Sequence, residues 1–351
     1  MSTAPTTRRP LLADVAAKAN VSIGTASRAL NGRGELSDRT RLAVQKAAEE
    51  LGFRPSPTAR SLRTRRSLTI GLVVPHISHA FYAGVTEGAQ ATLEEHGYRL
   101  ILVDSGEEPR RVGSALQTLV DQEVDGLLLS TAPVGVEQAR ETLAKTPCVC
   151  IDELLPGLGV GSVVLENAAG MGLLVEHMAG HGHTRIGCLA GPEDRSSGRE
   201  RREGFLAAVR ERGLDGSPEL IRGGDWTIAS GYREAKALLE VAERPSAIVT
   251  ASAELALGAL AAVRGAGLSI PQDVAMASFD DVYFAPLLEP PLTCVGYDTR
   301  SIGSEGARLL LAAIESEQPA WSESRIGVEL VARRSCGCHY DETSQLAEAI
   351  A

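Results

Sequence analysis

From Leu68 onward, short and almost uniformly apolar runs alternate with longer amphipathic segments. Apolar runs of this length are typical of parallel strands that are covered on both faces. We predict strands at 68–74, 98–104, 124–130, 147–153, 162–166, 185–191, 246–252, 274–280 and 293–298. Helical segments are expected between them, among others at 80–96, 109–122, 199–212 and 253–267. The alternation predicts parallel α/β sheets, in which ligands bind at the carboxyl ends of the strands.

The charge of the chain is distributed unevenly. The whole chain has a formal net charge of -10, but residues 1–66 contain 13 Lys and Arg against five Asp and Glu. This N-terminal part therefore carries +8 and the remainder -18. A basic segment attached to an acidic body indicates a polyanionic partner, because Lys and Arg pair with phosphates and release condensed counterions.

Residues 12–31 have the pattern of two short helices joined by a tight turn. Asn20 stands where the turn needs a left-handed backbone, and Ser22 is a good N-cap for a second helix at 23–30. Such a helix-turn-helix unit inserts its second helix into the major groove, N-terminus first. The side chains that would reach bases or phosphates are Ser22, Ile23, Gly24, Thr25, Ser27 and Arg28.

A third helix is predicted after Ser37, which would cap it, and before Gly52, which would end it. We expect Leu42, Val44 and Leu51 to pack this helix against the other two. A small helical domain that binds another protein is the alternative interpretation of residues 1–54.

Residues 53–66 are rich in Pro and Arg and indicate a linker. The segment 58–62 can form one or two helical turns, which are marginal alone in water.

Several segments together carry a family resemblance. The sequence DVAAKANVSIGTASRALNG and the following LSDRTRLAVQKAAEELGFRPSPTARSLR resemble the headpiece and hinge of the lac repressor (LacI/GalR) family. Further along, LTIGLVVPHISHAFYAGVTEGA, GHTRIGCLAGP, RREGFLAAV, DVAMASFDD and PPLTCVGYD follow in family order. The resemblance thus covers nearly the whole chain.

The resemblance implies a fold and a division into domains. The fold would be an N-terminal all-α helix-turn-helix headpiece followed by a two-lobed α/β sensor similar to periplasmic binding proteins, with the chain crossing between the lobes three times. The expected domains are the headpiece at 1–54, the hinge and linker at 55–67, the sensor at 68–340 and a short tail at 341–351. In the hinge, Leu62 would wedge between central base pairs from the minor groove, with Arg60 and Arg63 on phosphates. An ordinary apolar residue in a linker is the alternative for Leu62.

The resemblance also implies a set of effector-binding residues in the cleft of the sensor. Arg201 matches the family's main effector arginine, and Asp280 and Asp152 match acids that accept ligand hydroxyls. Phe81 and Trp226 stand where aromatic faces contact the ligand. As alternatives, the aspartates would only cap loops, Arg201 would be solvated, and Trp226 would belong to the core.

One departure from the family pattern concerns residues 251–253. The family commonly has Ala-Asn-Asp after this strand, whereas this chain has Ala251-Ser252-Ala253. Ser252 takes the expected ligand position with a shorter side chain and a single hydroxyl. His79 likewise replaces an Asn that is frequent in the first loop, so no ligand identity is transferred.

Two clusters of possible metal ligands are visible. His177, His181 and His183 lie close together, and Cys336 and Cys338 precede His339. Zinc sites usually need four ligands, and the segment with the two cysteines supplies only three. The resemblance implies an ordinary role for the histidines, because the family often has His at positions 177 and 183. We therefore expect no metal and no cofactor, with Cys336 and Cys338 as free thiols.

These features predict a DNA-binding transcriptional regulator that acts as a repressor. An enzyme is not expected, since no G-x-S-x-G, Walker A or H-E-x-x-H motif is present. The expected partners are a pseudo-palindromic double-stranded operator, a sugar-like effector and a second copy of the chain in a homodimer. No signal peptide or membrane span is recognised, so a cytoplasmic location is expected. A solute-binding protein, a sugar-processing α/β enzyme and an effector-independent regulator are the alternatives.

Overall fold

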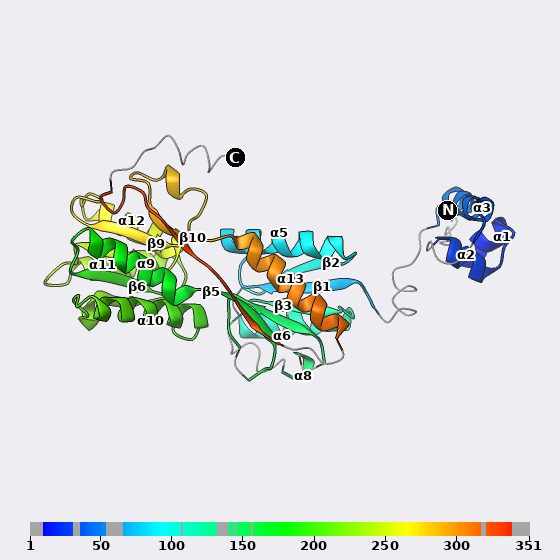
Figure 1. Ribbon diagram of the computed structural model, residues 1–351, viewed down its shortest axis with the longest axis horizontal. Coiled ribbons are helices and arrows are strands. Elements are labelled where there is room, and N and C mark those ends of the chain that lie inside the picture. The colour runs from blue at the N-terminus through cyan, green and yellow to red at the C-terminus, as the bar shows by residue number, and fades with distance from the viewer. Residues whose placement is uncertain are drawn as a thin grey trace, which may run out of the picture. The chain divides into compact units, whose positions relative to one another are not determined.

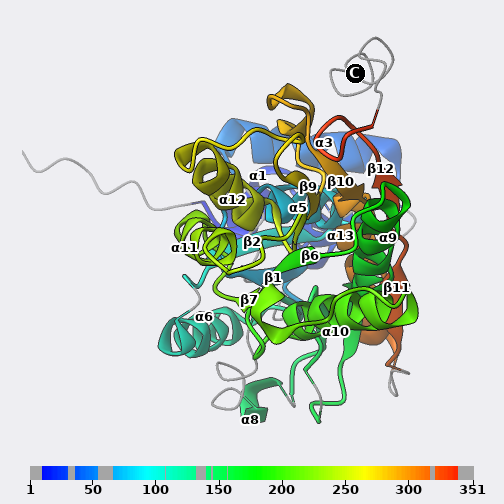
Figure 2. The same ribbon diagram turned by 90° about the vertical axis from the view of Figure 1, so that its left-hand side faces the viewer.

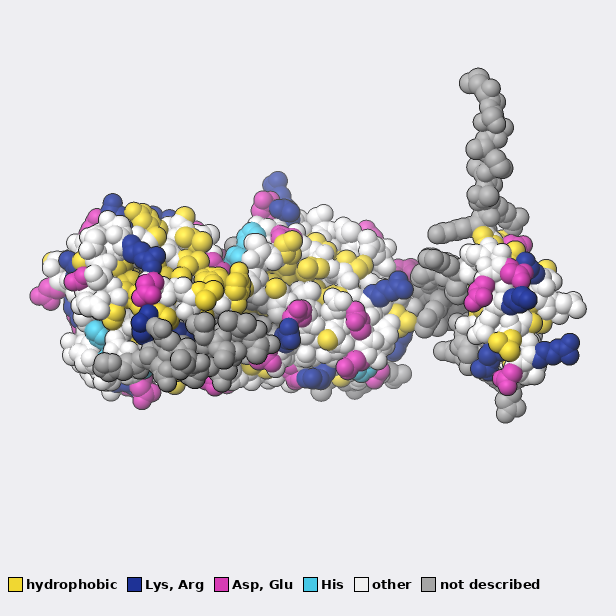
Figure 3. Space-filling model, turned by 90° about the horizontal axis from the view of Figure 1, so that it is seen from above, with side chains coloured by type: hydrophobic (Ala, Val, Ile, Leu, Met, Phe, Trp, Pro, Cys, Tyr) yellow, Lys and Arg dark blue, Asp and Glu magenta, His cyan; other side chains and the backbone are white. Residues whose placement is uncertain are grey.

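The computed structural model describes residues 10–30, 36–53, 66–106, 108–131, 140–143, 145–155, 157–316 and 321–338. The chain divides into two compact units, Met1–Ser67 and Leu68–Ala351. Of the Lys and Arg residues in the first 66 positions, six are described and seven lie outside the described residues. On the face of each unit drawn in Figure 3, positive and negative side chains are interspersed.

The described residues of the first unit form three helices: α1 (Leu12–Lys18), α2 (Ile23–Leu30) and α3 (Asp38–Leu51). Asn20 has a left-handed backbone (φ 53°), and Gly52 ends α3 with φ 63°. The Ser37 hydroxyl accepts a hydrogen bond from the Thr40 N–H, as expected of an N-cap. The turn and cap predictions are therefore confirmed.

The core of this unit consists of small and branched side chains from all three helices, namely Val15, Ala16, Ala26, Ala29, Val44, Ala47 and Ala48. The prediction that Leu42 packs in this core is wrong, because its side chain is 64% exposed. Val44, two positions on, is fully buried instead. Since α-helical positions two apart point to different sides, only one of the two can face α1 and α2.

The second unit consists of two α/β lobes. The sheet of the first lobe has the order β11-β5-β4-β3-β1-β2 with all pairs parallel. Helices α5 and α13 pack together beside this sheet, and α6 lies against β1 (Figure 1). The elements are β1 (Thr69–Val74), α5 (Ala80–Glu95), β2 (Arg99–Asp104), α6 (Pro109–Asp121), β3 (Gly126–Leu129), α8 (Arg140–Leu143), β4 (Cys148–Ile151), β5 (Gly161–Leu165), α13 (Thr299–Glu315) and β11 (Glu323–Ile326).

The sheet of the second lobe has the order β12-β10-β9-β8-β6-β7, and only β12 is antiparallel to its neighbour. Helices α9 and α10 pack on one side of it, and α11 and α12 on the other (Figure 2). The elements are α9 (Asn167–Gly180), β6 (Ile186–Ala190), α10 (Ser196–Glu211), η1 (Pro218–Leu220), β7 (Ile221–Gly223), α11 (Ile228–Leu239), β8 (Ala247–Thr250), α12 (Ala253–Gly265), β9 (Ala275–Phe279), η2 (Ala285–Leu287), β10 (Thr293–Gly296) and β12 (Glu329–Val331).

The chain passes between the lobes three times, from β5 to α9, from β10 to α13 and from β11 to β12. The two-lobed α/β fold is therefore confirmed. All nine predicted strands are present within a few residues of their expected limits, whereas β7, β11 and β12 were missed.

Candidate functional site

One face of helix α2 is not covered by the other described helices of its unit. Ser22, Ile23, Gly24 and Arg28 are exposed, and Thr25 and Ser27 are half-buried. Ala26 and Ala29 turn the opposite face of the helix into the core. The six residues predicted to contact DNA therefore share the surface of one helix, although their contact with DNA stays a prediction.

The N-terminus of α2 is held by local side-chain contacts. The Ser22 hydroxyl accepts a hydrogen bond from the Thr25 N–H at 3.1 Å and lies 2.9 Å from the Thr25 hydroxyl. This cap fixes the end of the helix that would lead into a groove. The predicted hinge residues Arg60, Leu62 and Arg63 lie outside the described residues.

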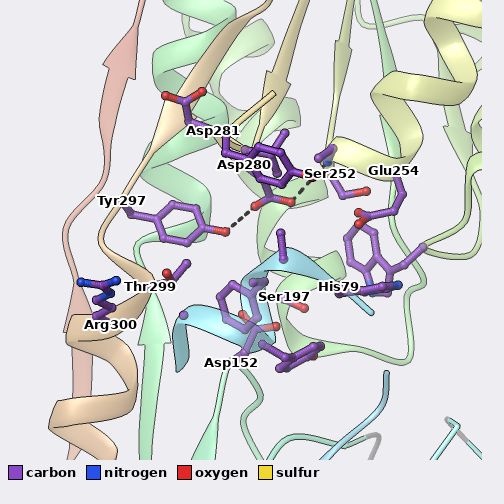
Figure 4. Close-up of a pocket in the computed structure, with 18 of the residues that line it drawn as sticks. His79, Asp152, Ser197, Ser252, Glu254, Asp280, Asp281, Tyr297, Thr299 and Arg300 are labelled. Carbon is purple, nitrogen blue, oxygen red and sulfur yellow. Dashed lines mark hydrogen bonds between the residues drawn. The ribbon is translucent and has the colours of Figure 1, made fainter. Parts of the chain in front are cut away.

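The second unit has a cavity of about 300 Å³ at the carboxyl ends of its strands. The cavity is lined from both lobes by all six predicted effector residues, namely Phe81, Asp152, Arg201, Trp226, Ser252 and Asp280. The first lobe contributes the start of α5 and the residue after β4. The second lobe contributes α10 and the loops after β7, β8 and β9 (Figure 4).

Arg201 is almost fully buried, with 5% of its surface exposed, so the interpretation as a solvated arginine is wrong. Its Nε donates to the Asn167 side chain at 2.8 Å, and its Nη1 donates to the Ala251 carbonyl at 2.6 Å. The guanidinium also lies 3.8 Å from the centroid of the Phe279 ring. Nη2 has no hydrogen-bond partner among the described residues, and Arg201 lines the cavity.

Asp280 follows β9 and has a left-handed backbone (φ 72°). Its Oδ1 accepts a hydrogen bond of 2.6 Å from the Tyr297 hydroxyl and lies 3.6 Å from Nη1 of Arg201. Its Oδ2 accepts from the Ala253 N–H at 3.3 Å, so the carboxylate also supports the start of α12 (Figure 4). Burial and the neighbouring Asp280 raise the pKa of Tyr297 well above its usual value, which keeps this hydroxyl a donor.

Asp152 follows β4 in the first lobe, again with a left-handed backbone (φ 64°). Its Oδ1 is buried and has no hydrogen-bond partner among the described residues. Burial raises the pKa of this carboxyl to about 8; Arg201 opposes the shift, and Glu153 and Asp280 add to it. An unpartnered polar atom at the wall of a cavity is costly unless a ligand or water satisfies it.

Ser252 is the N-cap of α12, where its hydroxyl oxygen accepts from the Leu255 N–H at 3.2 Å. The residue is 4% exposed. Capping occupies the oxygen as an acceptor, and a side-chain hydrogen bond from the same hydroxyl to Glu254 opposes the rise in the pKa of that carboxyl. With Ser in place of the Asn that is common in the family, this wall has a shorter side chain with a single hydroxyl.

Sequence reasoning missed further polar residues that line the same cavity, among them Ser197, Glu254, Tyr297 and Thr299. It noted His79 only as a departure from the family pattern, and His79 also lines the cavity. Tyr297 directly follows β10, so the rule that ligands lie at the carboxyl ends of strands could have found it.

Glu153, the neighbour of Asp152, joins the two lobes. Its buried carboxylate accepts hydrogen bonds from the backbone N–H and the hydroxyl of Ser196, both at 2.8 Å, and from the Ser197 hydroxyl at 3.0 Å. These residues begin α10 in the second lobe, so a carboxylate of one lobe caps a helix of the other. The charge suits the positive end of the helix dipole.

The most basic side chains of the cavity wall already have acidic partners. Arg201 lies beside Asp280, and Arg300 pairs with Glu87 at 2.8 Å. The lining also contains Asp152 and Glu254, whose pKa values are raised, first of all by burial. The cavity is therefore suited to hydroxyl or amine donors and poorly suited to a phosphate.

No helix in the described ranges is both long and apolar enough to cross a membrane.

Comparison with protein-family models gives two matches. Residues 11–56 match the bacterial regulatory proteins of the lacI family, and residues 175–336 match the periplasmic binding protein-like domain.

Curated relatives align over most of the chain. The HTH-type transcriptional repressor CytR of Escherichia coli is 32% identical over 326 residues, which cover 92% of this chain and 95% of the relative. The HTH-type transcriptional regulator CelR of Thermobifida fusca is 36% identical, with coverages of 88% and 93%. The ribose operon repressor of Escherichia coli is 31% identical, with coverages of 89% and 95%.

Two solved structures are similar over almost their entire length. The lac repressor dimer bound to operator and the anti-inducer ONPF has a TM-score of 0.84 and 25% identity, with coverages of 94% of this chain and 99% of that chain. The complex of the transcriptional regulator CelR with cellobiose has a TM-score of 0.69 and 34% identity, with coverages of 93% and 100%.

Proposed function

This chain belongs to the lacI family of bacterial regulatory proteins, and from that membership we propose that it represses transcription by binding an operator as a homodimer, under the control of a neutral polyhydroxylated effector. The observation that carries the effector part of the proposal is the buried, unpartnered Oδ1 of Asp152 at the wall of the cavity. A ligand hydroxyl donating to this atom would satisfy it.

The operator is expected to be pseudo-palindromic. The solved lac repressor relative is a dimer on its operator, and a two-fold dimer presents two reading helices to two half-sites. The exposed surface of α2, from Ser22 to Arg28, supplies the residues for such a contact. Because an operator lies on chromosomal DNA, we infer that the protein works in the cytoplasm. Its membership in a family of regulatory proteins supports a regulatory and not an enzymatic role.

The effector is expected to be a sugar or nucleoside without a phosphate group. The solved CelR relative is a complex with cellobiose, and another relative is the ribose operon repressor. In this chain, Arg201 and Arg300 already face carboxylates, so a phosphate would have to compete with Asp280 and Glu87 for them. Hydroxyls can instead donate to Asp152 and accept from Nη2 of Arg201, while Phe81 and Trp226 offer faces to C–H surfaces or rings.

Control of DNA binding requires an effector that binds two lobe arrangements with different affinity. Arg201 and Asp280 contact the ligand from the second lobe, and Asp152 contacts it from the first. Closure around the ligand would alter the spacing of the two linkers at Ser67 in a dimer. An effector-independent regulator is the alternative, favoured by the reduced polar wall at Ser252 and Ala253.

The first experiment selects operator DNA from a random library and compares Ile23→Ala with Leu42→Ala. Both side chains are large, apolar and exposed, but only Ile23 belongs to α2. We expect selected sites with two-fold symmetry, weaker binding by Ile23→Ala and unchanged binding by Leu42→Ala. Sites without symmetry, or equal binding by both variants, would contradict the operator proposal.

The second experiment screens neutral sugars, nucleosides and sugar phosphates by thermal shift, since a ligand that binds the folded protein raises its Tm. The effector proposal expects a neutral compound that raises Tm and alters operator binding. A response limited to sugar phosphates would refute the neutral class. A complete lack of response across the library would favour the effector-independent alternative.

A further inference from the structure

Two pairs of residues far apart in the sequence meet on the second lobe. His177 and His181 lie at the end of α9, and Cys336 and Cys338 lie in the turn that follows β12. The four side-chain ligand atoms all lie within 4.8 Å of one another. The Cys338 Sγ is 3.5 Å from Nε2 of His177 and 3.0 Å from Nε2 of His181.

Local structure explains how each pair is formed. His177 and His181 are one helical turn apart, which places both imidazoles on one side of α9, with ring centroids 4.8 Å apart. Between the cysteines, Gly337 takes φ 92°, a left-handed conformation that favours glycine, and the two sulfur atoms come within 3.0 Å. Each pair is therefore preformed in its own segment.

The backbone around Ser335 fixes the cysteine pair to the lobe. The Met276 N–H donates to the Ser335 carbonyl at 2.8 Å, and the Ser335 hydroxyl donates to the Met276 carbonyl at 2.6 Å. The Thr293 N–H donates to the Ser335 hydroxyl at 2.8 Å. These contacts are at the start of β9 and β10, so the cluster lies at the amino ends of the strands, on the side opposite the effector cavity.

Two thiols and two imidazoles form one of the ligand sets that bind structural zinc. At the usual Zn–S and Zn–N lengths, ligand atoms of a tetrahedral site are separated by about 3.3–3.8 Å, and the separations here range from 3.0 Å to at most 4.8 Å, so small side-chain shifts would bring the four atoms to one metal ion. The two cysteines are one residue closer in sequence than in most such sites, and the turn at Gly337 compensates by directing both thiols to one point.

We propose that these four side chains bind one Zn²⁺ ion, which fastens the end of the chain after β12 to helix α9. The prediction of free thiols without a metal considered each sequence cluster alone, and neither supplied four ligands. His183 is separate from the site, since its Nδ1 lies 2.9 Å from the Ser246 hydroxyl. His339 lies outside the described residues.

Further features suit a bound metal. The Thr293 hydroxyl donates to the Cys336 Sγ at 3.2 Å, and such outer contacts orient metal ligands and stabilise thiolate charge. Cys336 is buried, while His181 is exposed and leaves a path from solvent. A disulfide between the cysteines would not use either imidazole, whereas zinc accounts for all four groups.

The test measures zinc and free thiols in the full-length protein purified under reducing conditions without chelator. We expect about one zinc per chain, and Co²⁺ substitution should give the visible absorption of a tetrahedral thiolate site. His181→Ala and Cys338→Ala should each raise the zinc Kd by at least about 100-fold, since they remove direct ligands. His183→Ala and Cys148→Ala are the matched controls and should keep the metal.

Chelation gives a second measurement. Removing zinc should lower the Tm of the wild type toward that of Cys338→Ala, and should have little effect on the variant itself. Zinc below a tenth of an equivalent, or a Cys336–Cys338 disulfide in the reduced preparation, would overturn the proposal. Equal zinc content in His181→Ala and His183→Ala would also overturn it. The test needs neither operator nor effector, so its outcome is independent of the proposed regulatory function.

Discussion

Asp152 and Asp280 occupy equivalent positions in the two lobes. Each directly follows the strand that stands third in the order of its sheet, β4 in β11-β5-β4-β3-β1-β2 and β9 in β12-β10-β9-β8-β6-β7. Each also has a left-handed backbone, with φ of 64° and 72°. The two carboxylates reach the same cavity, and both interact electrostatically with Arg201.

The equivalence ends at their hydrogen bonds. Asp280 accepts from Tyr297 and from the Ala253 N–H, whereas Oδ1 of Asp152 has no partner in the described part of the chain. The carboxylate of Asp280 is thus fixed by hydrogen bonds within the second lobe, whereas that of Asp152 keeps an acceptor atom that a ligand can use. This asymmetry underlies the first two predictions.

Asp152→Asn should stabilise the free protein, and more strongly at pH 8 than at pH 5. Burial raises the pKa of Asp152 to about 8, whereas an unfolded chain has a value of about 3.9. Between these values the folded protein holds the extra proton, so stability falls as pH rises through this window. Tm measured against pH should fall less steeply in the variant. Parallel curves for both proteins would show that Asp152 does not titrate in this range.

Effector binding should release protons near pH 7. Ligand hydroxyls that donate to Asp152 favour its charged form, so the effector affinity should increase as pH rises toward about 8. Calorimetry in two buffers of different ionisation enthalpy measures the proton count directly. Asp152→Asn should bind without this release, and an unchanged release in the variant would assign the proton to another group, such as Glu254.

Arg201→Ala should weaken effector binding by roughly 1.5–3 kcal/mol or more, because a charged donor is lost and buried partners are left behind. Operator affinity without effector should barely change. Arg202→Ala is the control, since this neighbour is 38% exposed and lies 3.4 Å from Glu193. DNA titrations with and without effector distinguish the variants, and a wild-type response from Arg201→Ala would refute the cleft assignment.

Gly191→Ala should weaken effector binding through Trp226. A Cβ on Gly191 would lie 1.9 Å from Cη2 of the indole, so the ring would have to move out of its place in the cavity wall. Gly223→Ala is a matched control, because Gly223 ends the neighbouring strand β7 and a Cβ there meets nothing within 4 Å. Calorimetric titration should show a loss only for Gly191→Ala. Equal affinities would mean that Trp226 does not contact the effector.

Leu62→Ala should weaken operator binding while leaving effector binding nearly unchanged. An apolar wedge offsets the cost of unstacking a base step, on the order of a few kcal/mol. Ser61→Ala, one position earlier, serves as the control for the hinge segment. Operator titrations compare the three proteins, and equal affinities for wild type and Leu62→Ala would rule out the wedge.

The central part of the fold could be predicted from the sequence because buried parallel strands produce apolar runs that need no partner to be recognised. The missed strands have no such run. In β11, residues 323 and 325 are charged and the strand lies at a sheet edge, while β7 has only three residues, Ile221, Arg222 and Gly223. At the edge of a sheet, a segment becomes a strand because it pairs with the neighbouring strand, and the local pattern of apolar residues does not indicate that pairing.

The six effector positions could be carried over from the family resemblance, and the structure brings them to one cavity. Their burial and bonding could not be predicted. The pKa of Asp152 is raised by burial and by Asp280 and is opposed by Arg201, and these two residues lie 128 and 49 positions further along the chain. The contact between Cys338 and His177, which are 161 residues apart, could not be predicted from the local sequence of either segment.

The capping of α10 by Glu153 has a mechanical consequence. The hydrogen bonds of 2.8 Å from Ser196, together with those from Arg325 of β11 to Glu200 of α10, hold the start of α10 to the first lobe, so the lobes cannot slide past each other here without breaking them, and a relative motion that keeps them is a rotation about this region. In a rotation, displacement grows in proportion to the distance from the pivot. A rotation too small to alter the hydrogen bonds of Arg201, which lies near this region, would therefore displace the remote surfaces of each lobe by a much larger distance.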